Sequence, residues 1–285
     1  MKLQTPVEIR PLPDRFTYAD RFFFMGSCFA SEVGALMGGL EFNTTVNPFG
    51  VLYNPASLAS SFDRLDSRRH FVEEDVICSE GRYTSFFHHS SFSRCSAEEF
   101  LSNANQALEE SADAFAAAGA VVVTLGTSWV FRHLERDMIV SNCHKVHPAQ
   151  FRRERLSVAE SVALLEPVIA RHQDKRWIFT VSPIRHLKDG AHGNQVSKAS
   201  LLLAVEELAA KFECVSYFPA YEIVLDELRD YRFYKEDMVH PSEQAVGYVF
   251  EKFVEFAIES GEAGRMEDAR RRMKAAAHRK IQFAN

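Results

Sequence analysis

The chain has 285 residues, of which 46% are hydrophobic, 25% charged and 12% aromatic. These are the proportions of an ordinary globular protein with a sizeable core, and they exclude disordered, collagen-like and membrane-spanning chains. With 33 Lys and Arg against 39 Asp and Glu, the net charge is −6. The chain therefore has no basic field that would hold nucleic acid or anionic lipid, and we expect neither as a partner.

The five cysteines are odd in number and widely spaced, with no C-x-x-C pair; they are Cys28, Cys78, Cys95, Cys143 and Cys214. This pattern predicts no disulfide framework and indicates a reducing compartment. Residues 1–16 contain acidic residues and prolines where a signal peptide would have an apolar segment. We therefore predict a cytoplasmic location.

Short apolar runs alternate with helical patterns along the chain. Helix starts are marked by Asn54 before a proline and by two capping boxes, at 96–99 and 157–160. The run 120–125 is apolar on both faces, as central parallel strands are. The predicted strands are 21–25, 41–46, 120–125, 177–181 and 214–217, and the predicted helices are 29–37, 55–65, 157–172, 194–212 and 241–260, with one of about twenty residues after Ser96.

This alternation predicts an α/β fold with a central, mostly parallel sheet. We find no internal repeat, low-complexity tract or linker, so one domain is expected over residues 1–260. Residues 261–285 contain seven Lys and Arg against three Asp and Glu. We expect them to form a basic helical extension with a solvated surface.

Two loops carry residues suited to ester chemistry. In open α/β sheets, ligands bind at the carboxyl ends of the strands, and Ser27 lies there, between the first strand and the first helix. Nearby amide groups could hold an oxyanion, although Ser27 could equally be a plain N-cap. Near the C-terminus, Asp237 precedes His240 by three residues, a spacing that lets a carboxylate orient a general-base histidine. A helix-capping Asp followed by an exposed His would give the same Asp-x-x-His pattern.

The run Gly26-Ser-Cys-Phe-Ala30 resembles the motif that names the GSCFA family. Further blocks of that family follow in order over roughly residues 20–250; they are Asn47–Gly50, Thr124–Trp129, Asn142–Lys145, Ser182–His186 and Asp237–Ser242. The family is similar to the SGNH (GDSL-like) hydrolases. The resemblance implies an SGNH-hydrolase-like, flavodoxin-like three-layer fold and an esterase without a cofactor.

The resemblance also implies roles for individual residues. Ser27 would be the nucleophile, His240 the general base and Asp237 its orienter. The oxyanion hole would comprise Ser27, Gly50 and Ser128, which stands where the superfamily has an asparagine donor.

Two alternatives stay open within this assignment. A serine hydroxyl is short, and losing one oxyanion donor costs about 10²–10³ in turnover. His186 is therefore an alternative donor, because its loop should open on the same face. Cys28 is the alternative nucleophile, since a thiolate at a helix start would be reactive.

Polar residues in these blocks favour a polar or anionic acyl substrate. The predicted substrate-binding residues are Asn47, His89, His144, Lys145, Arg185 and His186. Cys143, His144 and His147 look like metal ligands, but no second cluster accompanies them, so no metal site is predicted. No G-x-G-x-x-G or P-loop sequence is present.

The sequence thus predicts a serine hydrolase, an esterase or deacetylase, acting on an oxygen ester of a polar or saccharide-like small molecule. An acyltransferase with the same triad is one alternative. A non-catalytic binding module with a decayed pocket is another. The natural substrate and the oligomeric state stay open.

Overall fold

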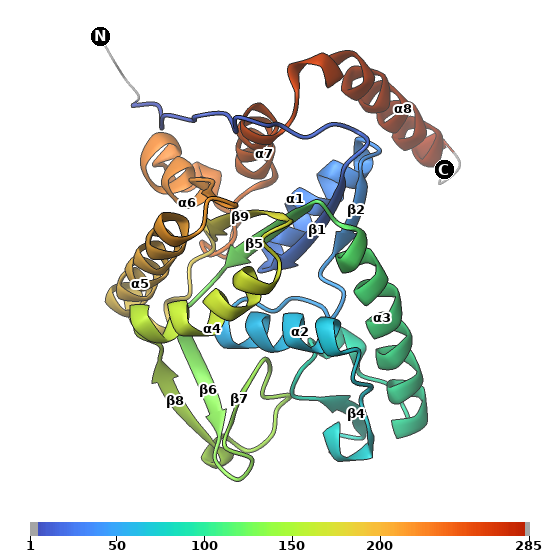
Figure 1. Ribbon diagram of the computed structural model, residues 1–285, viewed down its shortest axis with the longest axis vertical. Coiled ribbons are helices and arrows are strands. Elements are labelled where there is room, and N and C mark those ends of the chain that lie inside the picture. The colour runs from blue at the N-terminus through green and yellow to red at the C-terminus, as the bar shows by residue number, and fades with distance from the viewer. Residues whose placement is uncertain (1–4, 283–285) are drawn as a thin grey trace.

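A computed structural model describes the backbone of residues 5–282 and the side chains of residues 5–275 (Figure 1). Its centre is a parallel sheet in the order β10-β9-β5-β1-β2. The strands are β1 (Arg21–Gly26), β2 (Asn43–Val46), β5 (Ala120–Leu125), β9 (Arg176–Val181) and β10 (Val215–Tyr217). Renumbered along the chain, this order is 2-1-3-4-5, that of flavodoxin-like doubly wound sheets. The predicted α/β fold is confirmed.

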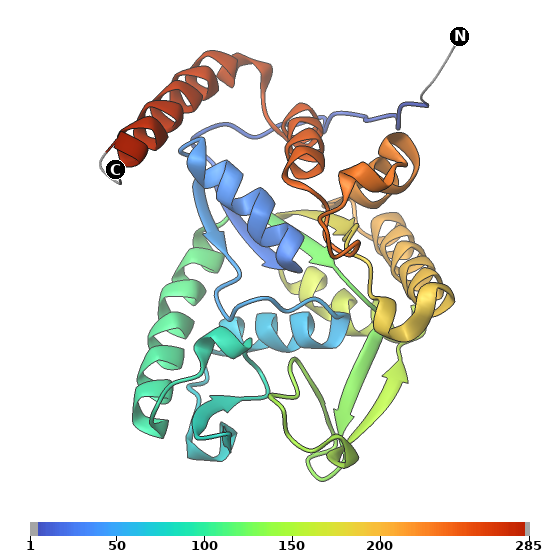
Figure 2. The same ribbon diagram turned by 180° about the vertical axis from the view of Figure 1, so that it is seen from behind.

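Helices cover both faces of the sheet (Figures 1 and 2). One face carries α1 (Cys28–Gly39), α6 (Ala220–Glu222) with the π-helical turn Ile223–Leu228, and α7 (Glu243–Ala257). The other carries α2 (Pro55–Ser67), α3 (Ala97–Ala117), α4 (Val158–Arg171) and α5 (Gly190–Lys211).

Strand β1 shows how the sequence builds these two layers. Phe22 and Phe24 join the core under α1 and α7, whereas Phe23 and Met25 join the core under α2 to α5. Successive side chains of a strand point to opposite faces, so a run of apolar residues serves both cores.

The helix starts follow the capping residues. Asn54 Oδ1 accepts the Ser57 N–H at 2.9 Å, and Ser157 and Glu160 form a reciprocal capping box. Each bond satisfies an amide that a helix leaves unpaired in its first turn.

The predicted start of the last domain helix at Pro241 is wrong. Helix α7 begins at Glu243, with Ser242 as the N-cap. Pro241 instead pairs with Tyr234 in an isolated bridge. The loop before α7 is therefore longer than predicted and is tied to an earlier segment.

Two small antiparallel sheets were not predicted. They are the hairpin of β3 (Val76–Ser79) and β4 (Arg82–Ser85), and the sheet β7-β6-β8, formed by β6 (Trp129–His133), β7 (Met138–Val140) and β8 (Phe151–Arg155). Strand β6 starts soon after the carboxyl end of β5, so this second sheet flanks the ends of the central strands (Figure 1).

The basic C-terminal segment forms α8 (Ala263–Gln282). Its first turns are not simply solvated: Met266 and Ala269 are buried, and the Arg272 guanidinium donates two 2.7 Å hydrogen bonds to the Glu41 carboxylate. These contacts hold the start of α8 against the end of α1. The extension was predicted to reach residue 285, and its residues 283–285 lie outside the part of the chain that the structure describes. Of the helices within residues 5–282, none combines the length and apolar content that a membrane crossing needs.

Candidate active site

The turn from β1 to α1 places Ser27 at the carboxyl edge of the sheet. Gly26 has a φ of +145°, and a Cβ there would lie 2.2 Å from the Thr124 carbonyl oxygen. Only glycine allows the chain to turn this close to β5. Ser27 Oγ accepts the Phe29 N–H at 3.2 Å and donates to Ser182 Oγ at 3.0 Å. Ser27 is thus the N-cap of α1 and also a hydroxyl at the strand ends.

The loop before α7 holds Asp237 and His240 together. His240 Nδ1 lies 2.7 Å from Asp237 Oδ2, and both side chains are partly exposed. Asp237 Oδ1 accepts the N–H groups of His240 and Val239 at 2.9 and 2.8 Å. These amides and the imidazole lower the pKa of Asp237 to about 2. An ionised carboxylate keeps the proton on Nδ1 and leaves Nε2 as an acceptor, the tautomer that a general base needs.

Contacts on two sides hold this loop at the edge of the sheet. Arg185, which follows β9, donates its backbone N–H to Val239 O at 3.1 Å and its guanidinium to Met238 O at 3.0 Å. On the other side, Lys235 Nζ lies 3.2 Å from Glu32 Oε1 on α1. Figure 2 shows the orange loop beside the start of the blue helix α1. The loop therefore lies between the helix that Ser27 caps and the end of β9.

A buried lysine that the sequence analysis missed lies beneath this edge. Lys198 Nζ donates to the carbonyls of Ser182 and Gly126, both at 2.6 Å, and so ties the ends of β9 and β5 together. The side chain is 1% exposed, and burial lowers its pKa to about 7. A sequence signal existed: Lys198 precedes Leu201 by three and Val205 by seven residues, which is the apolar face of the helix.

Ser128, a predicted oxyanion donor, is directed into the protein. It is fully buried, and its hydroxyl and backbone N–H lie 3.2 and 2.8 Å from Ser197 Oγ on α5. Thr127, one residue earlier, instead lines a cavity that opens beside the strand ends. The oxyanion role of Ser128 stays a prediction that this arrangement does not favour.

The amides of Ser27 and Gly50 have carbonyl partners as well. Ser27 N–H donates to Thr124 O at 3.1 Å, and Gly50 N–H donates to Asn47 O at 2.8 Å. An oxyanion would have to compete with these carbonyls for the two amides. Gly50 itself has a φ of +80°, and a Cβ there would lie 2.3 Å from His89 Cβ.

A cavity of about 590 Å³ opens beside the strand ends. His186 lines it, with its ring centre 5.3 Å from that of Tyr53. His186 Nε2 is buried and has no hydrogen-bond partner among the described residues. Burial, aided by nearby cations, lowers the pKa of His186 to about 3. The cavity is therefore lined by a neutral imidazole whose buried Nε2 has no partner among the described residues.

Part of the lining of this cavity comes from the unpredicted β7-β6-β8 sheet. Arg153 on β8 binds both carboxylate oxygens of Asp189, at 2.7 and 2.8 Å. Its guanidinium lies 4.3 Å from the Phe131 ring centre and 5.5 Å from that of Trp129. The wall is thus aromatic, with a cation already neutralised by a carboxylate.

Of the predicted substrate-binding residues, Arg185 and His186 line the cavity. Asn47 has a positioning role: Oδ1 accepts the Gly26 N–H at 2.8 Å, and Nδ2 donates to Ser31 Oγ at 2.7 Å. It therefore fixes the turn that carries Ser27.

The other predicted substrate-binding residues are not among those that line the cavity. The His89 ring lies 3.1 Å from Ser91 Oγ. His144 is buried, which lowers its pKa. Lys145 pairs with Glu80 at 2.6 Å on the exposed turn of the β3–β4 hairpin. The structure does not bring Lys145 to the cavity.

The structure also bears on Cys28, the alternative nucleophile, and on the residues that look like metal ligands in the sequence. Burial raises the pKa of the Cys28 thiol, which disfavours the reactive thiolate. Within residues 5–275, no group of three His, Cys, Asp or Glu side chains is arranged to hold a metal ion.

Fold and site define a class: flavodoxin-like α/β proteins with a serine after the first strand and an Asp-x-x-His before the last helix of the domain. The model of the GSCFA family matches residues 21–253, so the chain belongs to that family, as its motifs predicted. No curated protein matches the chain. Among solved structures it is similar to a mutant of Axe2, an acetyl-xylooligosaccharide esterase from Geobacillus Stearmophilus, at 10% identity and a TM-score of 0.45, over 85% of this chain and 95% of that one.

Proposed function

We propose that the protein is an SGNH-type serine hydrolase that cleaves an oxygen ester of a polar substrate. The observation that carries the proposal is the 2.7 Å contact between Asp237 and His240, held at the strand edge where Ser27 caps α1. A carboxylate-oriented imidazole near a strand-end serine is the arrangement that activates a hydroxyl nucleophile.

In this mechanism Ser27 exchanges its bond to Ser182 for one to His240 Nε2 when substrate binds. Catalytic hydrogen bonds often form only in the substrate complex. His240 takes the hydroxyl proton as Ser27 attacks the ester carbonyl, and returns it to the leaving alcohol. Water, activated by the same imidazole, then hydrolyses the acyl-enzyme.

The burial of Ser27 favours a small acyl group. Only 2% of the residue is exposed, so a long acyl chain would have to displace the residues around the β1–α1 turn. An acetyl ester needs little space beside the hydroxyl. A deacetylase acting on a saccharide-like or other polar alcohol is therefore the form of the proposal that we favour.

His186 is the oxyanion donor that we favour. Its neutral imidazole can donate one N–H. Its buried Nε2 has no partner among the described residues, and its side chain lines the cavity. Ser128, by contrast, is bonded to α5.

Two other functions stay open within the same geometry. An acyltransferase would use the same triad with an alcohol in place of water. The existing partners of the Ser27 and Gly50 amides favour a binding module without catalysis.

As for the compartment, all five cysteines are free thiols, which supports a reducing, cytoplasmic location.

A fluorophosphonate probe tests the proposal directly. We expect intact-protein mass spectrometry and peptide mapping to find the label on Ser27, and to find none in Ser27→Ala or His240→Ala. Cys28→Ala is the matched control and should be labelled normally. A label on Cys28, or full labelling of Ser27→Ala, would overturn the assignment.

A further inference from the structure

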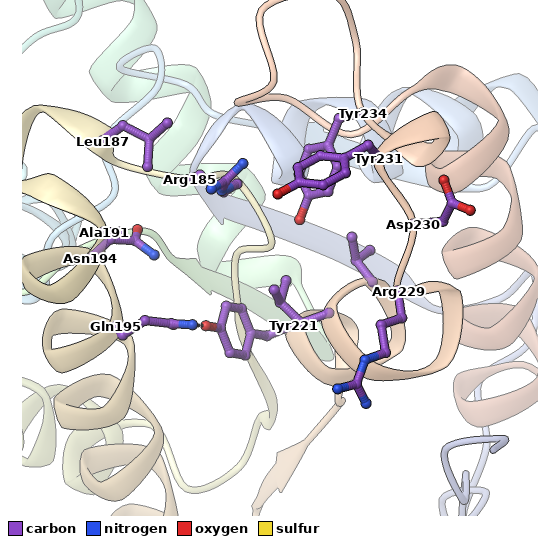
Figure 3. Close-up of a pocket in the computed structure, with 12 residues that line it drawn as sticks. Arg185, Leu187, Ala191, Asn194, Gln195, Tyr221, Arg229, Asp230, Tyr231 and Tyr234 are labelled. Carbon is purple, nitrogen blue, oxygen red and sulfur yellow. Dashed lines mark hydrogen bonds between the residues drawn. The ribbon is translucent and has the colours of Figure 1, made fainter. Parts of the chain in front are cut away.

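A second pocket, of about 280 Å³, lies next to the cavity at the strand ends. Tyr221, Tyr231 and Tyr234 line it (Figure 3). Arg185 and Leu187 line both hollows, so the two are neighbours. None of the three tyrosines has a role in the proposed ester chemistry. We call this hollow the tyrosine pocket.

The tyrosine pocket has aromatic residues on facing sides. Figure 3 shows Tyr221 and Gln195 along one side and Tyr231 and Tyr234 along the other. The Tyr221 hydroxyl donates to Gln195 Oε1, which fixes the ring. On the opposite side the Arg185 guanidinium lies 5.6 Å from the Tyr234 ring centre. The walls thus combine flat apolar faces with phenol and amide edges.

The backbone joins this pocket to the catalytic loop. Tyr234 pairs with Pro241 in an isolated bridge, and the next residue, Lys235, donates its N–H to His240 O at 2.8 Å. Arg185, on the shared wall, bonds to Val239 and so holds the other side of the loop. A ligand in the tyrosine pocket would therefore lie beside the segment that carries His240.

Most charges of the pocket are paired within the protein. The Arg185 guanidinium donates to Met238 O at 3.0 Å, and Arg229 pairs with Asp226 at 3.1 Å. Asp230 adds a carboxylate to the lining. Arg229 and Asp230 thus each have an ion-pair partner, and the Arg185 guanidinium is bonded to a backbone carbonyl, so the lining offers a multiply charged anion at most one unpaired cation.

An apolar chain fits the lining no better. The amide oxygens of Asn194 and Gln195 accept bonds from His186 N–H and the Tyr221 hydroxyl. An apolar chain would still displace water from the Tyr234 hydroxyl and from the side-chain N–H groups of Asn194 and Gln195, which is costly. A sugar ring suits both features, because its C–H faces pack on aromatic rings while its hydroxyl rim bonds to amides and phenols.

We propose that the tyrosine pocket is a saccharide subsite, which holds a neutral sugar ring of the alcohol part of the ester. The identity of this ring as part of the substrate rests on the proposed function. The binding of a neutral sugar does not. The ester would extend from the subsite past Arg185 towards His240 and Ser27.

The test measures binding without turnover, in the full chain carrying Ser27→Ala. Neutral xylo-, cello- and chito-oligosaccharides of four units are titrated by calorimetry and by saturation-transfer NMR. We expect at least one to bind. Adding Tyr231→Ala should weaken its binding about tenfold, because one aromatic contact is lost, and Tyr231→Phe, which keeps the ring, should largely preserve it. Tyr231 is 71% exposed, so its truncation leaves no hole in the core.

Leu203→Ala is the matched control, a truncation of an exposed side chain on α5 outside both pockets, and it should bind like its parent. Failure of all three sugars to bind, equal binding by Tyr231→Ala, or displacement of the sugar by inorganic phosphate would overturn the subsite. Hydrolysis of p-nitrophenyl acetate by the wild type tests the esterase separately. Tyrosine-dependent sugar binding without hydrolysis would support the subsite and contradict the esterase.

Discussion

Lys198 Nζ lies 2.6 Å from the carbonyl oxygen of Ser182, the residue whose hydroxyl accepts the hydrogen bond of Ser27. The buried amino group of Lys198 is thus linked to the proposed nucleophile through one residue, Ser182. Its two carbonyl bonds compensate part of the cost of burying it and fix the strand ends on which the site is built.

Lys198 should make stability depend on pH. Burial lowers its pKa from about 10.5 to about 7. Between these values the unfolded chain holds a proton that the folded chain has released, so the free energy of unfolding should rise with pH, by up to about 1.4 kcal/mol per unit. Urea unfolding at pH 7 and pH 9 measures this rise.

Lys198→Met should lose this pH dependence, whereas Lys211→Met, at an exposed position on the same helix, should keep it. Equal slopes in the wild type and Lys198→Met would show that Lys198 keeps its proton in the folded state.

The pH profile of ester hydrolysis should have a single rise. Asp237, with a pKa of about 2, is charged throughout the measurable range and adds no step above pH 4. A histidine accepts a proton as general base only in its neutral form, so kcat/KM for p-nitrophenyl acetate should rise with pH to a plateau. A flat profile would assign the base to another group.

Asp237→Asn should lower kcat by on the order of 10²–10⁴, because an amide can no longer hold the imidazole in the required tautomer. Asp113→Asn, a substitution of an exposed carboxylate on α3, is the control and should leave kcat unchanged. Near-normal turnover in Asp237→Asn would remove Asp237 from the mechanism.

The oxyanion donor can be assigned with two variants. His186→Ala should reduce kcat by about 10²–10³, and His186→Gln, which keeps an N–H donor, should recover part of it. Ser128→Ala should mainly lower the free energy of unfolding, by about 1 kcal/mol, since it removes the bond to Ser197. Steady-state kinetics and thermal unfolding of both variants decide the matter; the opposite pattern would restore Ser128 as the donor.

Gly26→Ala should destabilise the protein by at least about 2 kcal/mol, because the residue has a positive φ and its Cβ would meet the Thr124 carbonyl. Gly247→Ala, in α7 with open space around it, should instead stabilise the protein by up to about 1 kcal/mol. Denaturant unfolding compares the two. Similar stability in both variants would show that the β1–α1 turn tolerates a side chain.

The central sheet could be predicted because its signals are local. Apolar runs such as 120–125 and caps such as Asn54 identify strands and helix starts without reference to the rest of the chain. The β6–β8 sheet escaped prediction because β8 is a mostly charged strand, Phe-Arg-Arg-Glu-Arg, in which no apolar face repeats. The start of the last helix was predicted too early, at Pro241, for another reason. Pro241 forms a bridge with Tyr234, and the local sequence does not encode this tertiary contact.

The same difference between local and long-range contacts applies to the candidate site. Asp237 and His240 lie three residues apart, so their pairing could be expected from the sequence. The contact of Ser27 with Ser182 joins residues 155 positions apart, and only the strand order brings them together. Likewise, the bond of Ser128 to Ser197 depends on how α5 packs, which no single motif encodes.

The ion pair between Arg272 and Glu41 has a practical consequence. Glu41 follows the last turn of α1, so it lies at the end of that helix opposite to Ser27. Helix α8 thereby lies far from the β7-β6-β8 sheet (Figure 1), whose residues line the strand-end cavity. A protein immobilised on a sensor surface through α8 would present its cavity to the solution, which makes this helix the suitable anchoring point for screening ligands.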